Sequence, residues 1–452
     1  MVKKNQQLTV YVSAQGNKGE GIAYVENLPI HIDNTLPQDE VTIKILKVTK
    51  LRAFAKLLLV ITPSPTRVVP LCLVATSCGG CQLQHQLYQS QLNFKQFQLK
   101  QVLDTHVTNL GNIYKPIVAL SEPWRFRYKM QFALAIDTQT QQLKVGLYAS
   151  RTHRVVDSHD CKIATSQINQ VVDHVKRWYD KVDVTVFNEQ TGQGSLRFLT
   201  VRQVRLNEKV MVILTVAQQT DCLTSFVNDI KRIACVCSIY VCYQADKTID
   251  NILSDELILL WGDKQLEEEL LSIRCYVSAQ SFMQGNALLV ERLYQQVIDC
   301  CSAAKNTRVL DIYCGVGILS LALAKQGFDV IGIDLNQQAI LDAQRNNQLN
   351  GLDVKFVCQA AEQFLTTFDC TEYTVVLDPP RQGCHVEVLQ ALCHAQPAVI
   401  CYVSCNPVTL GQDLKELVAA GYIIDAITPV DMFSQSIHLE AVVILKSGLN
   451  FF

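Results

Sequence analysis

Two thiols lie four residues apart in the segment 401–407, written CYVSCNP. The segment is typical of an apolar strand over 398–405 that ends where the chain turns at Asn-Pro. Cys401 would lie in the middle of that strand, which is the usual place of a small buried core residue. Cys405 would lie at its carboxyl end, where a thiol can be partly exposed and can reach a substrate. The spacing therefore favours Cys405 as the thiol that does chemistry.

Two carboxylates accompany this thiol in the sequence. Asp378 opens the run DPPR after the preceding predicted strand, and Glu440 closes HLE before the last one. A thiolate that adds to carbon 6 of a pyrimidine makes carbon 5 nucleophilic, and a base must later remove the carbon 5 proton. Cys405 suits the nucleophile and Glu440 the base. Asp378 can hydrogen-bond the uracil edge.

A glycine turn upstream indicates a nucleoside site. The run DIYCGVG over 311–317 is a strand followed by a turn that contains Gly315 and Gly317, where the backbone can approach a ligand closely. Asp334 ends the next predicted strand, where a carboxylate can bind ribose hydroxyls. The third glycine of the dinucleotide fingerprint is missing, which favours S-adenosylmethionine over a dinucleotide. The alternative is a plain helix-start turn and a surface carboxylate.

The elements that must position these residues indicate an α/β multidomain protein. Residues 1–62 alternate apolar and polar types in short bursts, which predicts a small β-barrel. Residues 63–265 carry a helical stretch and then strand-like patterns, which predict a central antiparallel α+β domain. In 266–452 strands and helices alternate, which predicts a doubly wound parallel sheet with its ligands at the carboxyl ends of the strands.

Charge and composition narrow the class of protein. Residues 1–160 contain 18 Lys and Arg against 10 Asp and Glu, although the whole chain has a net charge of −2. A basic N-terminal part fits contact with a polyanion such as RNA, although charge alone leaves chance as an equal explanation. We find no secretion signal and no apolar run of membrane-spanning length, so we expect a cytoplasmic protein.

A second group of cysteines predicts a metal site. Cys72, Cys78 and Cys81 lie within one short run, and Cys161 follows a strand in a polar context. Such a density of thiols in a reducing compartment points to a metal. Four thiolates suit zinc and an iron–sulfur cluster equally, and the spacing alone does not decide between them. The alternative is four cysteines without a metal.

These motifs resemble the RNA (uracil-C5)-methyltransferase family over nearly the whole chain. The matching runs are SCNP, DPPRxG, LDxYCGxG, HLE and FMQGN, the last at 282–286. The resemblance is nearest to the branch that acts on 23S ribosomal RNA, which carries a TRAM β-barrel in front. It implies a 4Fe–4S cluster held by the four cysteines named above. It also implies a flipped uridine in a loop or single strand of 23S ribosomal RNA as the substrate, with no membrane or protein partner and a monomeric enzyme.

The resemblance also assigns roles to single residues. In the family, the cysteine before Asn-Pro is the nucleophile and the glutamate of HLE is the general base, which fall on Cys405 and Glu440. The remaining matches are cofactor contacts, and they fall on Gln284, Tyr313, Gly315, Gly317, Asp334 and Asp378. One departure is Ile318, which stands where related sequences can carry a cofactor-contacting asparagine.

Two other functions compete with this interpretation. An amino-methyltransferase would carry an aromatic residue after Pro-Pro, but Arg381 stands there and Cys405 would have no role. An iron–sulfur RNA-binding or redox-sensing protein with a relic methyltransferase fold would have no need of an intact Cys405, Glu440 and Asp378.

Overall fold

The computed structural model describes residues 2–448 apart from 109, 247–251, 255 and 305. The chain divides into two compact units, one of residues 1–98, 147–156 and 433–438 and one of residues 99–146, 157–432 and 439–452. The division into three domains expected from the sequence stays a prediction. None of the helices in the described ranges combines the length and apolar character that crossing a membrane requires.

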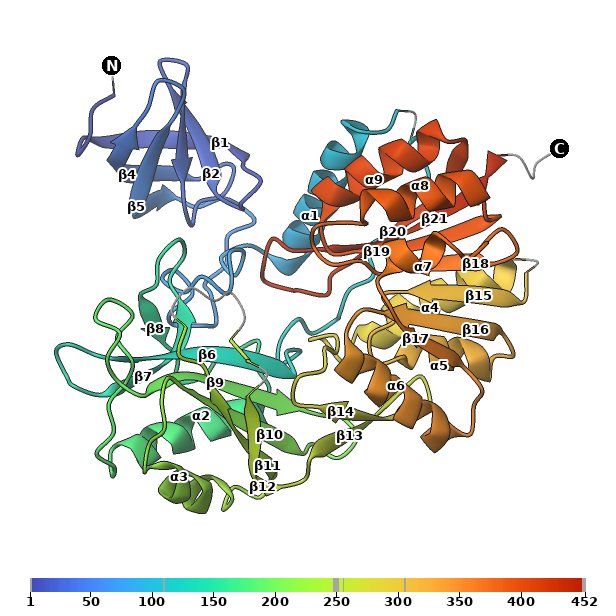
Figure 1. Ribbon diagram of the computed structural model, residues 1–452. Helices are drawn as coiled ribbons and strands as arrows, with labels where there is room; N and C mark the ends of the chain where they lie inside the picture. The colour runs from blue at the N-terminus through green and yellow to red at the C-terminus, as the bar shows by residue number, and fades with distance from the viewer. Residues whose placement is uncertain (1, 109, 247–251, 255, 305, 449–452) are drawn as a thin grey trace. The chain divides into compact units, whose positions relative to one another are not determined.

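The first unit contains the predicted barrel, drawn in blue in Figure 1. The barrel is closed, with the strand order β1-β2-β3-β5-β4, and β1 pairs with β4 to complete it. Its interior is filled by the inward-facing apolar residues, among them Val12, Ile30 and Ile43, none of which has exposed surface. The strands are β1 (Gln7–Gln15), β2 (Gly21–Val25), β3 (Leu28–Ile32), β4 (Glu40–Val48) and β5 (Ala53–Thr62).

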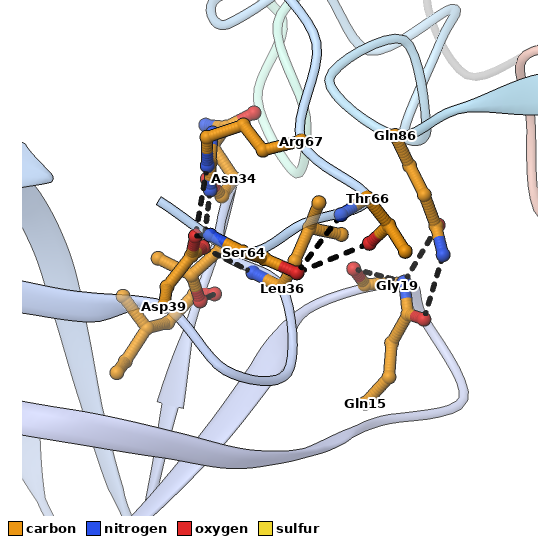
Figure 2. A network of polar contacts seen from close by, with 11 residues as sticks. Gln15, Gly19, Asn34, Leu36, Asp39, Ser64, Thr66, Arg67 and Gln86 are labelled. Carbon is orange, nitrogen blue, oxygen red and sulfur yellow. Dashed lines mark hydrogen bonds and ion pairs between the residues drawn. The ribbon is translucent and has the colours of Figure 1, made fainter. Parts of the chain in front are cut away.

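The proline-rich segment after the barrel is tied back to it through Asp39 (Figure 2). This buried carboxylate accepts the N–H groups of Leu36 at 2.6 Å and Ser64 at 2.8 Å, and it pairs with the guanidinium of Arg67. Arg67 also donates to the carbonyl of Asn34 at 3.0 Å. Burial acts to raise the pKa of Asp39, but the hydrogen bonds outweigh it, and the pKa lies below its usual value.

The central domain is built on a seven-stranded sheet with the order β12-β11-β10-β9-β6-β7-β8. The expectation of an antiparallel sheet is wrong for one pair, because β10 and β11 run parallel. The helix α3 (Leu223–Ile230) connects them, and such a crossover returns the chain in its original direction. The other elements are β6 (Lys129–Ile136), β7 (Leu143–Tyr148), β8 (Val155–Asp157), α2 (Ser166–Tyr179), β9 (Leu196–Gln203), β10 (Val210–Val216), β11 (Val236–Tyr243) and β12 (Leu257–Gly262).

The C-terminal part of the second unit is a doubly wound sheet with the order β17-β16-β15-β18-β19-β21-β20. The helices α7, α8 and α9 pack next to one another on one side of this sheet, and α5 and α6 lie on the other (Figure 1). The elements are α4 (Val290–Ala303), β15 (Arg308–Ile312), α5 (Ile318–Lys325), β16 (Asp329–Asp334), α6 (Gln337–Asn350), β17 (Lys355–Cys358), α7 (Ala361–Leu365), β18 (Thr374–Leu377), α8 (Val386–Ala395), β19 (Val399–Ser404), α9 (Pro407–Ala419), β20 (Tyr422–Val430) and β21 (Glu440–Ser447).

Only part of this sheet is parallel, which corrects the expectation of an all-parallel sheet. The strands β15 to β19 pair in parallel, but β21 runs antiparallel to both β19 and β20. The reversal places the start of β21, rather than its end, at the carboxyl edge of the parallel strands. A hairpin of β13 (Gln265–Leu270) and β14 (Ile273–Ser278) precedes this domain, and α1 (Tyr88–Asp104) contributes Leu99 and Leu103 to its core.

Candidate active site

The turn after β15 takes its shape from backbone conformations that favour glycine. Gly315 has φ +56° and Gly317 has φ +80°. A Cβ atom on Gly317 would come within 2.6 Å of the ring of Phe356, so no side chain fits there. At Gly315 a Cβ would meet no atom within 4 Å, which leaves its open side to a ligand. The turn also contains Tyr313, which adopts φ +71°.

Asp334 fixes this turn at the end of β16. One oxygen of its carboxylate accepts the N–H of Gly315 at 2.9 Å, and the other accepts the N–H of Asn336 at 2.8 Å. Each carboxylate oxygen has a second lone pair, so both can still accept a hydroxyl. Asp334 therefore shapes the turn and remains able to bind a ligand.

A cavity opens above this turn, with about 510 Å³ of space including its open mouth. Four of the predicted cofactor residues line it, namely Gln284, Tyr313, Gly315 and Asp378. Gly317 lies within the turn itself, and Asp334 accepts the N–H of Gly315 there. Ile318, the departure noted in the sequence, is a lining residue too.

Two further polar side chains line the cavity and were missed in the sequence. Asp311 is buried in β15 and accepts the hydroxyl of Ser320 at 2.5 Å. An acid inside the apolar run RVLDI was the signal that could have identified it. Tyr294 reaches the cavity from α4, and a tyrosine at this helical position carries no signal of its own.

Cys405 and Glu440 both lie at the carboxyl edge of the sheet. The antiparallel register of β19 and β21 ends with the pair Ser404 and Ala441, so Cys405 and Glu440 are the residues that adjoin this last pair, and the charge of Glu440 acts on the Cys405 thiol. Cys405 is half-buried and Cys401 is fully buried, as the spacing predicted. The geometry thus brings together the thiol and the carboxylate that the sequence singled out.

The carboxyl groups at this edge have raised pKa values. Burial, with a smaller contribution from Asp378, raises the pKa of Glu440 to about 8, and its Oε2 atom is buried without a hydrogen-bond partner. Burial and the charge of Asp311 raise the pKa of Asp378 to about 7. Unpaired acids with shifted pKa values are typical of sites that move protons.

The thiol of Cys405 is subject to opposing influences. Burial makes the largest contribution and raises the pKa of this thiol, and the carboxylates of Glu440 and Asp378 act in the same direction. The guanidinium of Arg381 lowers it. Cys405 therefore needs a positive charge nearby to react as a thiolate at neutral pH.

The predicted metal ligands fall in different units and are described separately. In the first unit, Cys78 forms a backbone bridge to Ala149, and its Sγ accepts the N–H of Gly80 at 3.4 Å. In the second unit, the N–H of Cys161 donates to the side chain of Asn169 at 2.9 Å. Within the described ranges no group of three or more His, Cys, Asp or Glu side chains is arranged to hold a metal ion. The predicted set of Cys72, Cys78, Cys81 and Cys161 gains no support from the structure.

Comparisons with known proteins agree with the fold and the motifs. Residues 87–448 match the family model described as tRNA (Uracil-5-)-methyltransferase, and residues 2–58 match the TRAM domain. Two uncharacterized RNA methyltransferases, from Clostridium tetani and Listeria monocytogenes, are 33% and 34% identical to the chain; each alignment spans 98% of this chain and 97% and 98% of the relatives.

A solved structure is similar over almost the same length. It is the tRNA (uracil-54, C5)-methyltransferase of Pyrococcus abyssi in complex with S-adenosyl-L-homocysteine, with a TM-score of 0.79 and 27% identity over 97% of this chain and 99% of that one. The family model spans most of the chain, and the relatives span nearly all of it. The chain therefore belongs to the RNA uracil-C5 methyltransferase family and carries a TRAM domain at its N-terminal end.

Proposed function

We propose that this chain transfers a methyl group from S-adenosylmethionine to carbon 5 of a uridine in RNA, with Cys405 as nucleophile and Glu440 as general base. The observation that carries the proposal is that a half-buried thiol and a buried carboxylate both adjoin the last pair, Ser404 and Ala441, of two antiparallel strands. Both lie at the sheet edge that also holds Asp378. Family membership supports the reaction, and this placement supports the two roles.

The cavity fits the proposed cofactor. S-adenosylmethionine carries a methyl group on a cationic sulfonium, and when bound it supplies that methyl group. Asp311 and Asp378 place carboxyl groups on the cavity wall, which suits a ligand with positive charge. The open side of Gly315 admits close approach of a ligand to the backbone, and the spare lone pairs of Asp334 suit ribose hydroxyls.

The side chains divide the reaction into the addition of a thiolate, which precedes methyl transfer, and its elimination afterwards. The Cys405 thiolate forms a bond to carbon 6 of the uracil, and the electrons of the ring double bond move toward the carbon 4 oxygen. Carbon 5 is then nucleophilic and takes up the methyl group as the sulfur–methyl bond breaks, with its electron pair left on the sulfur of S-adenosylhomocysteine. The carboxylate of Glu440 removes the proton from carbon 5. The ring double bond re-forms, and the thiolate is expelled.

The RNA target belongs to the same proposal. We assign the enzyme to 23S ribosomal RNA in the cytoplasm because its run of cysteines near residue 80 and its TRAM domain resemble that branch of the family. To reach carbon 6, the thiol requires a uridine that has left its stack. Mass mapping of 5-methyluridine in ribosomal and transfer RNA, from cells with and without the gene, tests the assignment. Loss of 5-methyluridine from transfer RNA alone, in cells without the gene, would refute the assignment to 23S ribosomal RNA.

We also propose that Cys72, Cys78, Cys81 and Cys161 hold a 4Fe–4S cluster. The proposal rests on the donor set in the sequence and on the resemblance, since four thiolates are the usual ligands of such clusters. Iron and sulfide analysis of protein purified without oxygen tests it, together with the visible absorption. A purified protein that is active and contains zinc or no metal would contradict it.

Tritium release tests the proposed reaction. RNA that carries tritium on carbon 5 of uridine should release it to water in the presence of the cofactor. Wild-type protein should release tritium, whereas Cys405→Ala should not. A methylated product formed at a ring nitrogen, with the tritium retained, would show that another position is the target.

A further inference from the structure

The helix that follows the nucleophile carries a polar face with a regular spacing. Asn406, Thr409 and Asp413 are separated by three and four residues, so they lie on one face of α9. All three contact the loop 381–384 that follows DPP. Because Cys405 immediately precedes this helix, the contacts connect the nucleophile to the loop that carries Arg381.

Asn406 uses both ends of its side-chain amide. Its Oδ1 accepts the N–H of Val408 at 3.1 Å, which caps the start of α9. Its Nδ2 donates to the carbonyl of Arg381 at 2.9 Å. The hydroxyl of Thr409 donates to the same carbonyl at 3.3 Å. Serine or aspartate would cap the helix equally well, but aspartate has no donor and serine carries its donor and acceptor on one oxygen, whereas an amide places them on two atoms that can face different partners.

The other end of the loop, at residues 383 and 384, contacts a buried side chain of α9. The carboxylate of Asp413 is buried and accepts the N–H of Cys384 at 2.9 Å and the hydroxyl of Tyr402 at 2.5 Å. Gly383 adopts φ +85°, and a Cβ there would lie 2.9 Å from the Asp413 carboxylate. The loop therefore packs against the helix closely enough that only glycine fits at this point.

We propose that Asn406 is a positioning residue that fastens the Arg381 loop to the helix cap beside Cys405, so that guanidinium and thiol keep a fixed relation. The inference rests on the proposed role of Cys405. Of the charged side chains that act on this thiol, Arg381 favours the thiolate, whereas Glu440 and Asp378 oppose it. Loss of the amide donor leaves the carbonyl of Arg381 with only the longer hydrogen bond from Thr409, while the helix remains capped.

The test is the pH dependence of alkylation at Cys405. Iodoacetamide reacts with the thiolate, and mass spectrometry of the peptide that contains Cys405 separates it from the 17 other cysteines of the 18 in the chain. Asn406→Ser keeps a capping oxygen but is too short to reach Arg381. We expect it to shift the alkylation profile to higher pH and to slow alkylation several-fold at neutral pH. Thr409→Val should shift the profile in the same direction by a smaller amount.

Two controls separate positioning from a loss of helix stability. Asn336→Ser changes the same residue type at the cap of α6, where the side chain bonds only Ala339 among the residues that the structure describes, so it should leave the profile unchanged. In an Arg381→Ala background, Asn406→Ser should have no further effect. An unchanged profile for Asn406→Ser, or an equal shift in both backgrounds, would overturn the inference. Alkylation needs no turnover, so a failure of the proposed methylation would appear separately, as absence of tritium release in wild-type protein.

Discussion

The turn after β15 and the edge formed by β19 and β21 belong to one sheet, but their polar groups are in opposite states. At the turn, both oxygens of Asp334 accept backbone N–H groups, and glycines provide the conformation. At the edge, Glu440 has a buried oxygen without a partner, and burial raises the pKa of both Glu440 and Cys405.

The difference separates binding from chemistry. A turn whose groups are already paired is rigid, and it can offer a preformed surface to a nucleoside. An edge with an unpaired carboxyl oxygen and a thiol of raised pKa lowers the stability of the resting protein. These groups can exchange protons during the reaction. Changes at the turn should therefore affect affinity and folding, and changes at the edge should affect turnover.

Replacement of the thiol gives the largest expected effect. Cys405→Ala should lower turnover by at least about a thousandfold, because it removes the thiol that we propose forms the bond to carbon 6. The affinity for S-adenosylhomocysteine should not change, since the cofactor cavity is lined by other residues. Methylation assays and calorimetric titration measure the two quantities. Turnover near the wild-type rate would contradict the comparison.

A side chain in the turn should damage folding and cofactor binding together. Gly317→Ala places a Cβ against Phe356 in a left-handed conformation, and we expect a loss of about 1–3 kcal/mol in the free energy of unfolding. Gly351→Ala is the matched control, because Gly351 has φ +62° but open space around it. It should lose only the conformational part, about 1 kcal/mol. Urea denaturation measures both losses. If the two variants lost the same free energy of unfolding, the close packing at Gly317 would make no contribution to stability.

Glu440→Gln should change how stability depends on pH. The pKa of Glu440 is about 8 in the folded protein and 4.5 as the reference value, so the folded state retains a proton that the unfolded state releases between these values. This contribution is complete below pH 4.5 and is lost as the pH rises toward 8, and the total loss amounts to a few kcal/mol at most. The variant should therefore become more stable than wild type as the pH rises through this window. Thermal denaturation of both proteins across this pH range measures the difference. A difference in stability between variant and wild type that does not change with pH would contradict the assigned burial of Glu440.

The smallest expected effect is at Asp334. Asp334→Asn leaves one side-chain oxygen for the N–H groups of Gly315 and Asn336, so one of these hydrogen bonds is lost, which should cost about 1 kcal/mol and lower cofactor affinity several-fold. Asp329→Asn, at the exposed start of the same strand, is the control and should bind as wild type does. A loss of turnover at saturating cofactor in Asp334→Asn would show that the turn does more than bind.

Much of this arrangement could be predicted because short-range patterns carry it. The ends of β16, β18 and β19 follow from buried apolar runs, and these ends place Asp334, Asp378 and Cys405 at one edge. A glycine that follows a helical run is another short-range signal, and Gly351 closes α6 in the left-handed conformation.

The direction of strands and the depth of side chains could not be predicted in the same way. The run EAVVILKS reads as a buried strand in either direction, and its antiparallel course depends on how the chain returns from β20. That course is what places Glu440 beside Cys405. The parallel pair β10 and β11 was missed because α3 was not recognised as a crossover. Tyr294 was missed because only the packing of α4 directs it into the cavity.

The most direct test of the central claim uses RNA with 5-fluorouridine at the target position. Fluorine on carbon 5 cannot be removed as a proton, so Glu440 cannot complete the reaction and the thiol should remain bonded to carbon 6. Wild-type protein and Glu440→Gln should form an adduct that survives denaturing electrophoresis, with the RNA attached to the peptide that contains Cys405. The absence of an adduct with active wild-type protein, or an adduct with Cys405→Ala, would contradict the account.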